Sequence, residues 1–529
     1  MTDKYKNFLK LNFYQIYPRS FMDSDNNGWG DLKGVIEKVP YLADLGIKGV
    51  WFSPFYPSTF ADGGYDIADY CDIDPRIGTL EDFKEMLGKM HESGIKVIID
   101  LVVNHTSVYH KWFQESKKSK DNPYHDYYYW FDEPQNTWGA GFGGSAWEYC
   151  EDCGQYYLHS FAVEQADLNW HNPIVREEIR KVVDFWVDLG VDGFRCDVLD
   201  CISKDLTQNI FWNGPKFHEY VHELFGREKT KDLYVIGECW TTTADNLYDL
   251  SADERGELTT SFVDGNIRSV TNRFDFIENL DYDTIHRHFT QFENLTQEKD
   301  LIFAPYFENH DQSRSVSRFV RDDRYRYEAA TFFATLLYTS RGTPFILQGQ
   351  EFGTPDAKYD SIECFDDPAT LNFYEVHKDE LSHEELFSRM NGDSRDNGRR
   401  PMLWDCSTNG GFNKGAEPWL PLHSDYKTYN LENDLKSDKS VFRFYKKMLA
   451  LRNNSDALTL GKFEDMTGDR TDAFIYSRTG EDGKYVIVCN YKNESIIDIP
   501  DNYELVISNY ADRSGDCFRP FEAAVYKMK

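Results

Sequence analysis

Three carboxylates stand at the ends of apolar segments, where a parallel sheet would bring them together. In GFRCDVLD, Arg195 and Asp197 are two positions apart, so on a strand both side chains point to the same side. The arginine favours the ionised form of that carboxylate. In GECWTT, Glu238 has apolar neighbours, a setting that favours the protonated form needed by a general acid. In FENHD, His310 and Asp311 end a later segment.

This combination fits the cleavage of a glycosidic bond. That reaction needs a nucleophile, a proton donor and negative charge against an oxocarbenium-like transition state. A single carboxylate at a strand end could equally be a solvated surface group. Three of them at three strand ends, with arginine and histidine neighbours, favour a catalytic site.

Runs of β-branched and aromatic residues recur along the chain with helical stretches between them, which predicts a parallel α/β sheet. Each run is apolar first and ends in polar residues, as expected of a (β/α)8 TIM barrel with its site at the carboxyl ends of the strands. The runs are NFYQIYP, IKGVWFSP, IKVIIDLVVNH, VDGFRCDV, DLYVIGECW, IFAPYFENHD and TPFILQGQE, with LTTSFVDGN as the expected sixth strand.

A helix is predicted in TLEDFKEMLGKMHESG, where Thr79 and Asp82 resemble a capping box and Gly94 marks the stop. The segment SVFRFYKKMLALRN is expected to be the last barrel helix.

Two further modules are expected beside the barrel. About 85 residues separate His105 from Val191, far more than a βα loop needs, which predicts a small inserted α+β domain after the third strand. Alternating segments such as DAFIYSR and KYVIVCNY predict a C-terminal antiparallel β-sandwich. We expect the barrel to comprise residues 1–104 and 173–459, the inserted domain 105–172, and the C-terminal domain 460–529.

Charge and hydropathy exclude several classes of protein. The chain has 529 residues with 58 basic and 90 acidic side chains, a formal net charge of -32 that disfavours binding to nucleic acids and anionic membranes. No run of roughly 20 apolar residues predicts a membrane span, and the N-terminus does not resemble a signal peptide. We therefore expect a cytoplasmic protein, acting as a monomer on a small neutral substrate.

The ten cysteines are too sparse for a disulfide framework. Cys150 and Cys153 form a CxxC pair, but a structural zinc site needs four ligands and no second pair accompanies them. Cys196 and Cys239, which adjoin candidate catalytic carboxylates, are expected to be buried packing residues.

The segments DYCDIDPRIGT, DLVVNHTS, GFRCDV, GEC, ENHD and GRRPMLWD, in this order, resemble the signature segments of the α-amylase superfamily, in particular its oligo-1,6-glucosidase branch. The resemblance runs from about Tyr14 to Trp404 and is weak in the C-terminal domain. It implies that Asp197 is the nucleophile, Glu238 the acid and base, and Asp311 the carboxylate that stabilises the transition state.

The resemblance also implies a sugar-binding pocket. The sugar-contacting residues would be Tyr65, His105, Arg195 and His310. Asp62 and Arg399 would close the pocket around the non-reducing end, with Arg395 and Arg400 as alternatives to Arg399. Phe142 and Trp147 of the inserted domain could stack on sugar rings, although most aromatic residues must be core.

A metal site is predicted in DSDNNGWGD. Asp23, Asp25, Asn27, the backbone carbonyl of Trp29 and Asp31 present oxygen atoms at alternating positions, which suits a hard cation such as Ca²⁺, with Mg²⁺ as an alternative. The same residue types also favour tight turns. The family resemblance agrees with a structural Ca²⁺, and no organic cofactor is expected.

The resemblance implies an exo-acting retaining α-glucosidase. Val198, directly after the expected nucleophile, resembles enzymes that favour α-1,6 bonds, so isomaltose and short isomalto-oligosaccharides are the expected substrates. The alternatives are α-1,4 bonds, sucrose, trehalose 6-phosphate, glucosyl transfer, or an inactive partner subunit. Gln350 stands where relatives have Glu, and we expect this change to affect acceptor specificity.

Overall fold

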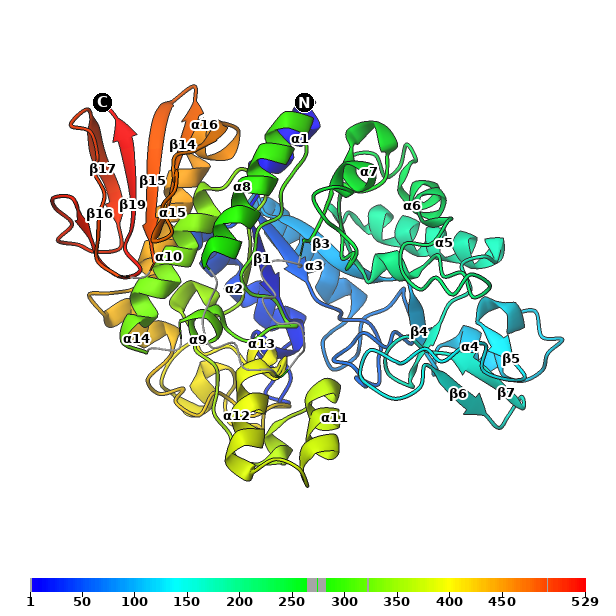
Figure 1. Ribbon diagram of the computed structural model, residues 1–529. Helices are drawn as coiled ribbons and strands as arrows, with labels where there is room; N and C mark the ends of the chain where they lie inside the picture. The colour runs from blue at the N-terminus through cyan, green and yellow to red at the C-terminus, as the bar shows by residue number, and fades with distance from the viewer. Residues whose placement is uncertain (1, 264–273, 275–281, 321–322, 492) are drawn as a thin grey trace.

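The computed structural model describes residues 2–263, 274, 282–320, 323–491 and 493–529. Its centre is a parallel sheet with the strand order β11-β10-β9-β3-β2-β1-β12 (Figure 1). The strands are β1 (Phe13–Ile16), β2 (Gly49–Phe52), β3 (Lys96–Val102), β9 (Gly193–Asp197), β10 (Tyr234–Gly237), β11 (Thr260–Ser261) and β12 (Phe345–Leu347). This is the predicted TIM barrel.

One barrel position lacks a regular strand, although IFAPYFENHD predicts one. Residues 301–306 lie between β12 and β11: Phe345 N donates to Pro305 O at 2.9 Å, and Thr260 Oγ1 donates to Ile302 O at 2.7 Å. Because Pro305 has no N–H, a full ladder cannot form there. The sixth strand, β11, falls within LTTSFVDGN as expected, but residues 264–266 of that segment lie outside the described residues.

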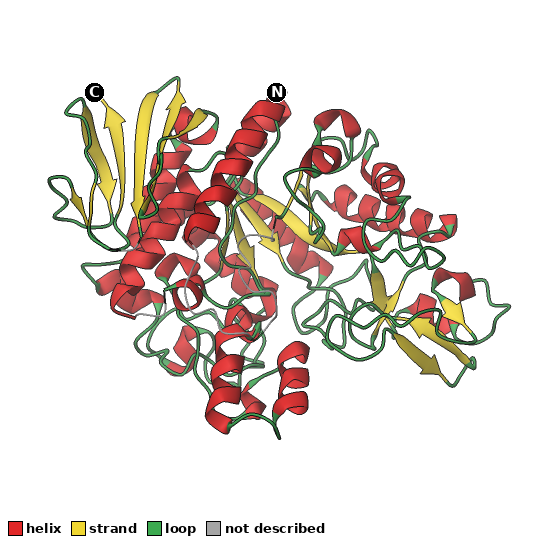
Figure 2. Cartoon of the chain, viewed as in Figure 1, coloured by secondary structure: helices red, strands yellow, loops and turns green. Residues whose placement is uncertain are grey.

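Helices surround the barrel, as Figure 2 shows for the whole chain. The helices that follow the strands are α2 (Leu32–Leu45), α3 (Leu80–Glu92), α5 (Pro173–Leu189), α6 (Phe217–Phe225), α7 (Leu247–Ser251), α8 (Tyr282–Lys299), α10 (Arg326–Thr339) and α15 (Val441–Asn453). Shorter helices are α1 (Asp3–Leu9), α9 (Ser315–Phe319), α11 (Pro368–His377), α12 (His383–Asp393), α13 (Asp396–Arg399), α14 (Leu431–Lys436) and α16 (Asp456–Thr459).

The predicted signals of α3 are confirmed. Thr79 and Asp82 form a reciprocal capping box, which satisfies the first free N–H groups of the helix. The helix ends at Glu92, and Gly94 takes a φ of +71°, which a residue with a side chain rarely adopts.

Small sheets lie between β3 and α5, where the insertion is expected. Strands β4 (His105–Ser107) and β8 (Gln165–Asp167) pair antiparallel, and β5 (Trp130–Phe131), β7 (Gln155–Leu158) and β6 (Trp147–Cys150) form a second sheet beside α4 (Lys111–Ser116). Figure 1 shows this module on the side of the barrel away from the C-terminal strands.

The C-terminal part is an antiparallel sheet with the order β13-β14-β15-β19-β17, accompanied by a two-stranded sheet. Its strands are β13 (Lys462–Asp465), β14 (Ala473–Gly480), β15 (Gly483–Asn490), β17 (Tyr503–Ser508) and β19 (Ala523–Met528), with β16 (Ser495–Ile496) pairing β18 (Cys517–Phe518). Ile475 and Val488 on one face of the large sheet share a core with Ile497 and Phe518, so the two sheets pack together as predicted for a sandwich. The residue bounds predicted for the three domains stay a prediction.

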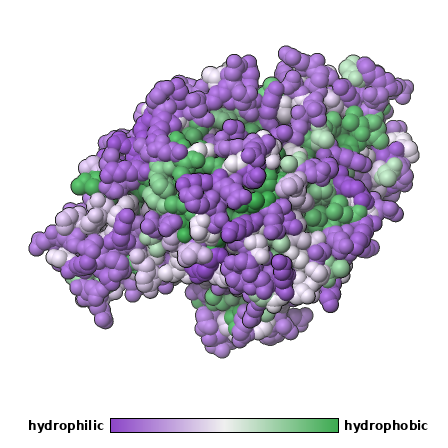
Figure 3. Space-filling view, turned by 180° about the vertical axis from the view of Figure 1, so that it is seen from behind, coloured by the Kyte–Doolittle hydropathy of each residue, from purple (hydrophilic) through white to green (hydrophobic). Residues whose placement is uncertain are grey.

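The face seen in Figure 3 is mostly hydrophilic, with hydrophobic patches across its middle. None of the described helices is long and apolar enough to cross a membrane.

Candidate active site

The alternation of side chains along the barrel strands brings the polar residues to one end of the barrel. Ile98 and Ile236 belong to the apolar cluster that also contains Phe13 and Trp51. Two residues further on, and therefore on the same inward face, stand Asp100 and Glu238. The middle of the barrel is thus filled by apolar side chains, and ionisable side chains lie at the carboxyl ends of the strands.

One guanidinium joins three of these carboxylates. Arg195, on β9 and only 2% exposed, lies 2.6 Å from Asp100 Oδ1 and 2.7 Å from Asp197 Oδ1 through Nη1, and 2.8 Å from Glu238 Oε2 through Nη2. Burial raises the pKa of Asp100 to about 6 and raises the pKa of Asp197 well above its ordinary value, in both cases against the opposing effect of Arg195. One guanidinium carries a single positive charge, so full ionisation of all three carboxylates around it is electrostatically unfavourable.

The environment of Glu238 differs from the sequence-based expectation of an apolar setting. Besides its ion pair with Arg195, Oε2 accepts a hydrogen bond from Val198 N at 3.1 Å. Val198 has a φ of +33°, unfavourable for a β-branched residue. This backbone conformation points the Val198 N–H toward Glu238 at the end of the neighbouring strand. The residues that flank Glu238 in the sequence give no sign of this contact.

Asp311 lies among cations and a neutral imidazole. Its Oδ1 is 2.8 Å from Arg399 Nη2, and its Oδ2 is 3.0 Å from His310 Nε2. Burial alone would raise the pKa of Asp311, but His310, Arg399 and Arg395 together hold that pKa well below its usual range. Asp311 is therefore an ionised carboxylate at neutral pH.

His310 is held in one orientation. The amide Nε2 of Gln15 lies 2.7 Å from its Nδ1, and the Tyr65 hydroxyl lies 2.6 Å from its Nε2. The Tyr65 ring stacks on the imidazole at 5.3 Å, and its hydroxyl donates to Asp100. Burial lowers the pKa of His310 well below its ordinary value, so the imidazole is neutral. An amide N–H that donates to Nδ1 leaves the ring proton on Nε2, facing Asp311.

His105 also lines the pocket. Its Nδ1 is 3.0 Å from Asn104 Nδ2, and its Nε2 is 3.0 Å from Gln165 Nε2. The oxygen of Asn104 accepts from the buried Lys204 ammonium at 2.6 Å, which fixes the orientation of the amide. Burial lowers the pKa of His105 to about 4, so this imidazole is also neutral.

Both Arg399, the expected partner of Asp62, and Arg395, its alternative, form ion pairs with Asp62, and Arg395 is the nearer of the two and the one that lines the pocket. Arg395 Nη2 lies 3.0 Å from Asp62 Oδ1, whereas Arg399 Nη1 lies 3.9 Å away and its Nε donates to His310 O. Arg400 instead donates to Pro421 O. Arg399 supports Asp311 from behind, while Arg395 reaches the pocket.

A single pocket collects these groups. Among the described residues its lining is Asp62, Tyr65, His105, Gly141, Phe142, Phe161, Asp197, Val198, Glu238, Trp240, His310, Asp311 and Arg395. Of the predicted site residues, Arg195 and Arg399 lie behind this lining. The ring of Phe142 packs 4.7 Å from the Arg395 guanidinium carbon, so it reaches the pocket, whereas Trp147 is a core residue of the inserted domain.

Phe161 and Trp240 also line the pocket but are not among the predicted site residues. Trp240 follows Glu238 by two positions, and that spacing could have indicated it. Gln350 lies away from this pocket: its Oε1 accepts from Leu347 N, and its Nε2 donates to Tyr445 at 3.4 Å. The side chain of Gln350 therefore contacts residues of the barrel wall and does not line the pocket. Its expected effect on acceptor specificity stays a prediction.

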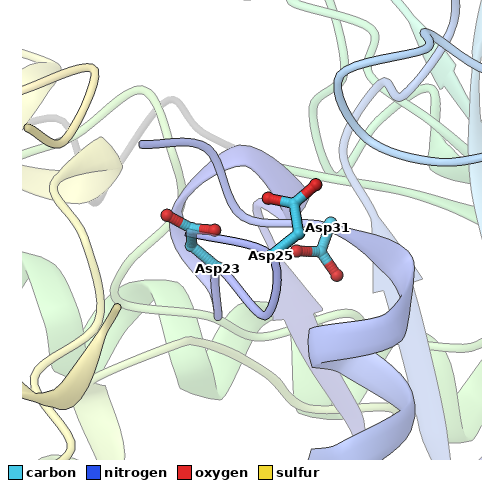
Figure 4. A group of neighbouring side chains, drawn as sticks. All are labelled: Asp23, Asp25 and Asp31. Atoms are coloured by element: carbon cyan, nitrogen blue, oxygen red, sulfur yellow. The ribbon is translucent and has the colours of Figure 1, made fainter. Parts of the chain in front are cut away.

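The metal prediction falls on the loop before α2. Carboxylate oxygens of Asp23, Asp25 and Asp31 all lie within 4.8 Å of one another (Figure 4). Asp31 also caps α2 by accepting from Gly34 N at 2.7 Å. Partial burial and the neighbouring Asp31 and Asp23 raise the pKa of Asp25. In the described part of the chain no ion pair to Lys, Arg or His offsets these charges, so the donor set fits a hard cation. Asn27 and Trp29 lie in the same loop, where Asn27 Oδ1 accepts from Trp29 N.

Comparison with known proteins agrees with the geometry. The model of the α-amylase catalytic domain matches residues 15–461. The chain belongs to the α-amylase family. Within it, the chain is 40% identical to the oligo-1,6-glucosidase of Parageobacillus thermoglucosidasius, with 98% of each chain covered. This α-amylase family member is accordingly a glycoside hydrolase.

Solved structures of other family members have the same fold. The trehalose-6-phosphate hydrolase of Bacillus licheniformis superposes with a TM-score of 0.92 at 36% identity, covering 98% of this chain and 99% of that one. The isomaltulose synthase of Erwinia rhapontici gives 0.91 at 34% identity, with 99% of each chain covered. Family membership alone therefore does not determine the substrate.

Proposed function

We propose that the protein is an exo-acting retaining α-glucosidase that hydrolyses α-1,6 bonds at the non-reducing end of isomaltose and short isomalto-oligosaccharides. The observation that carries this proposal is the guanidinium of Arg195, which links Asp197 to Glu238 while Asp311 faces the same pocket. Two carboxylates held by one guanidinium favour the close pair of a retaining enzyme, roughly 5 to 5.5 Å apart, over the wider pair of an inverting one.

In this mechanism each of the three carboxylates has a separate role. The Asp197 oxygen that is not bonded to Arg195 attacks the anomeric carbon while Glu238 gives its proton to the departing oxygen. Asp311, ionised between its cations, stabilises the positive charge that develops on the ring. Glu238 then takes a proton from water, which releases glucose with its α configuration retained.

The pairing of Asp62 with Arg395 supports exo action, since these residues would close one end of the pocket. Asp62 and Arg395, which both line the pocket, form an ion pair, and both side chains are nearly fully buried. The oxygens and N–H groups that they present to the pocket suit the hydroxyls of a terminal glucose. A chain that continued in this direction would meet the wall.

Val198 supports the choice of an α-1,6 bond. The absence of a free cation from the described pocket lining supports an uncharged substrate. Val198 lines the pocket directly after Asp197. Among the described residues, Arg395 is the one arginine or lysine in the lining, and it is engaged by Asp367, Asp62 and Asp311. A phosphorylated disaccharide such as trehalose 6-phosphate would lack a free cation to bind its phosphate.

The test compares initial rates on isomaltose, panose, maltose, sucrose and trehalose 6-phosphate, with the anomer of the first product followed by NMR. Isomaltose should be preferred, and α-glucose should appear first. Asp197→Asn should lower kcat at least about a thousandfold, because it removes the nucleophile but keeps the shape. Circular dichroism should show a folded variant.

The matched control is Asp188→Asn, on a surface carboxylate that pairs with Lys229. It should leave kcat unchanged. A folded Asp197→Asn enzyme with normal turnover would overturn the mechanism, and a preference for trehalose 6-phosphate would overturn the substrate.

We also propose that the loop containing Asp23, Asp25 and Asp31 holds a structural Ca²⁺, for which Mg²⁺ is the alternative. The bound cation would neutralise the three carboxylates and fix the entry into α2. It would take no part in bond cleavage.

A further inference from the structure

Two cysteines of the inserted domain take no part in the proposed catalysis. Cys150 ends β6 and Cys153 lies in the turn before β7, and neither residue lines the catalytic pocket. Figure 1 shows β6 and β7 at the outer edge of the inserted domain. Gly154 N donates to Cys150 O at 2.9 Å and closes the turn, where Gly154 takes a φ of +68°. The CxxC pair thus stands at the tip of a hairpin.

The turn suits a disulfide. Residues three apart in a tight turn have Cα atoms within about 7 Å of each other, and disulfides bridge Cα separations of about 4.4 to 6.8 Å. Both cysteine side chains are half-buried and pack against the main hydrophobic core, so they face the same side of the hairpin. Cys153 Sγ lies 3.9 Å from Cys150 O. Asp152, at the tip, pairs with Lys117 of α4 at 2.8 Å, which holds the turn in place.

A pair of thiols could instead bind a soft metal ion. A structural zinc site needs four ligands, and a catalytic one takes three from the protein. In the part of the chain that the structure describes, the one group of three or more metal-ligating side chains is the aspartate cluster before α2. No third ligand therefore accompanies the CxxC pair there. A bond between the two sulfurs needs no further partner.

We propose that Cys150 and Cys153 form a reversible disulfide by exchange with a small disulfide, and that this bond stabilises the hairpin of β6 and β7. One thiolate of the pair attacks a sulfur of the small disulfide and releases one small thiol. The other thiolate attacks the resulting mixed disulfide, closes the Cys150–Cys153 bond and releases the second small thiol. The protein loses two electrons and two protons, and the small disulfide gains them. The inference does not depend on the proposed function.

The surroundings of the pair determine the choice of reagent. Burial and the neighbouring Cys150 thiol raise the pKa of Cys153 to about 11, so little of it is thiolate near neutral pH and exchange is slow. Glu148 and Glu151, which flank the pair and are exposed, repel an anionic disulfide such as oxidised glutathione. The neutral bis(2-hydroxyethyl) disulfide is therefore the suitable probe.

The experiment treats the full chain with this reagent and analyses the products by peptide mass spectrometry. The peptide that contains Cys150 and Cys153 should lose two hydrogen atoms and gain no hydroxyethylthio group, and dithiothreitol should reverse the change. Cys406 and Cys517 are the internal comparison, because they are exposed and have no other cysteine near them in the sequence. They should gain the group instead.

The second measurement is amide hydrogen exchange in β7. Closing so short a loop should slow this exchange about tenfold relative to the reduced protein. Cys150→Ser and Cys153→Ser each remove one partner, so the reagent should leave exchange in both variants unchanged. Cys364→Ser is the matched control, since it removes a half-buried thiol from another segment, and it should respond like the wild type. The kcat of the oxidised enzyme should be normal, because neither sulfur lines the pocket.

Two results would overturn the disulfide. One is a stable hydroxyethylthio adduct on Cys150 or Cys153 of the wild type. The other is a pair that keeps both thiols after prolonged treatment at about pH 9, where thiolates are more abundant. A disulfide that forms but leaves hydrogen exchange in β7 unchanged would overturn its stabilising role.

Discussion

Arg395 is fixed by carboxylates from three segments of the chain. Its Nε lies 2.6 Å from Asp367 Oδ1, its Nη2 3.0 Å from Asp62 Oδ1 and its Nη1 3.3 Å from Asp311 Oδ1. The planar fork of arginine can meet three partners at once, whereas the single ammonium of lysine cannot. The closed end of the pocket therefore depends on this residue type as well as on its charge.

Replacing Arg395 by Lys should raise KM for isomaltose about tenfold or more, because the terminal glucose loses a positioned partner. Arg399→Lys is the comparison. That side chain contacts Asp311 behind the pocket, so the change should act mainly on kcat. Steady-state kinetics of both variants measures the difference, and a larger KM effect in Arg399→Lys would contradict the assignment of the wall to Arg395.

The sequence could not distinguish these arginines for a physical reason. Positions 395 and 399 are four apart around the short helix α13, so both can lie on one helical face. Only the tertiary structure shows which reaches the pocket. Glu238 is a similar case: its neighbours in sequence are apolar, but the cation that pairs with it comes from the adjacent strand β9.

At the scale of elements, the barrel strands are predictable because each is buried on both faces and ends in polar residues. The segment 301–306 has the same composition, but Pro305 prevents a regular ladder. Hydrogen bonding that depends on one missing N–H cannot be inferred from an apolar run alone.

The loop before α2 gives a prediction about stability. Ca²⁺ at about a hundred times its dissociation constant should stabilise the wild type by roughly 2–3 kcal/mol relative to a chelated sample. Asp25→Asn should abolish most of this difference. Asp25 is exposed and accepts hydrogen bonds only from Asn27 among the described residues, so its loss should disturb the loop little by itself.

Thermal unfolding with CaCl₂ or EDTA provides the measurement. Asp44→Asn, on an exposed carboxylate of α2 that pairs with Lys446, should respond to calcium like the wild type. If neither CaCl₂ nor EDTA changes the melting temperature of the wild type, the calcium site is ruled out.

At the scale of the whole molecule, a buried ion pair joins the barrel to the C-terminal domain. Arg478 on β14 lies 2.8 Å from Glu293 on α8, and the exposed fractions of the two side chains are 0% and 2%. The other Glu293 oxygen accepts from Arg341 N at 2.7 Å. Removing one partner would leave a buried charge uncompensated.

Arg478→Met should lower the free energy of unfolding by about 3–5 kcal/mol while kcat of the folded enzyme stays normal. Denaturant unfolding and activity at low temperature measure the two quantities. Lys484→Met breaks the exposed pair with Glu464 in the same domain and should cost less than about 1 kcal/mol. Equal losses in the two variants would show that the buried pair does not secure the domain.

The order of the modules along the chain was predictable from run lengths and periodicity, because an oversized loop and a change from helical to alternating patterns are local signals. The way the modules attach was not. Arg478 and Glu293 are 185 positions apart, and neither has a sequence context that indicates burial.

The pocket closed by Asp62 and Arg395 has a consequence for the order of events in a catalytic cycle. With one end sealed, the shortened chain must leave through the mouth before water can reach the glucosyl group on Asp197. Glucose then departs last through the same opening. Free glucose returns to the enzyme form that receives new substrate, so it should act as a competitive inhibitor, and turnover should slow as the product accumulates.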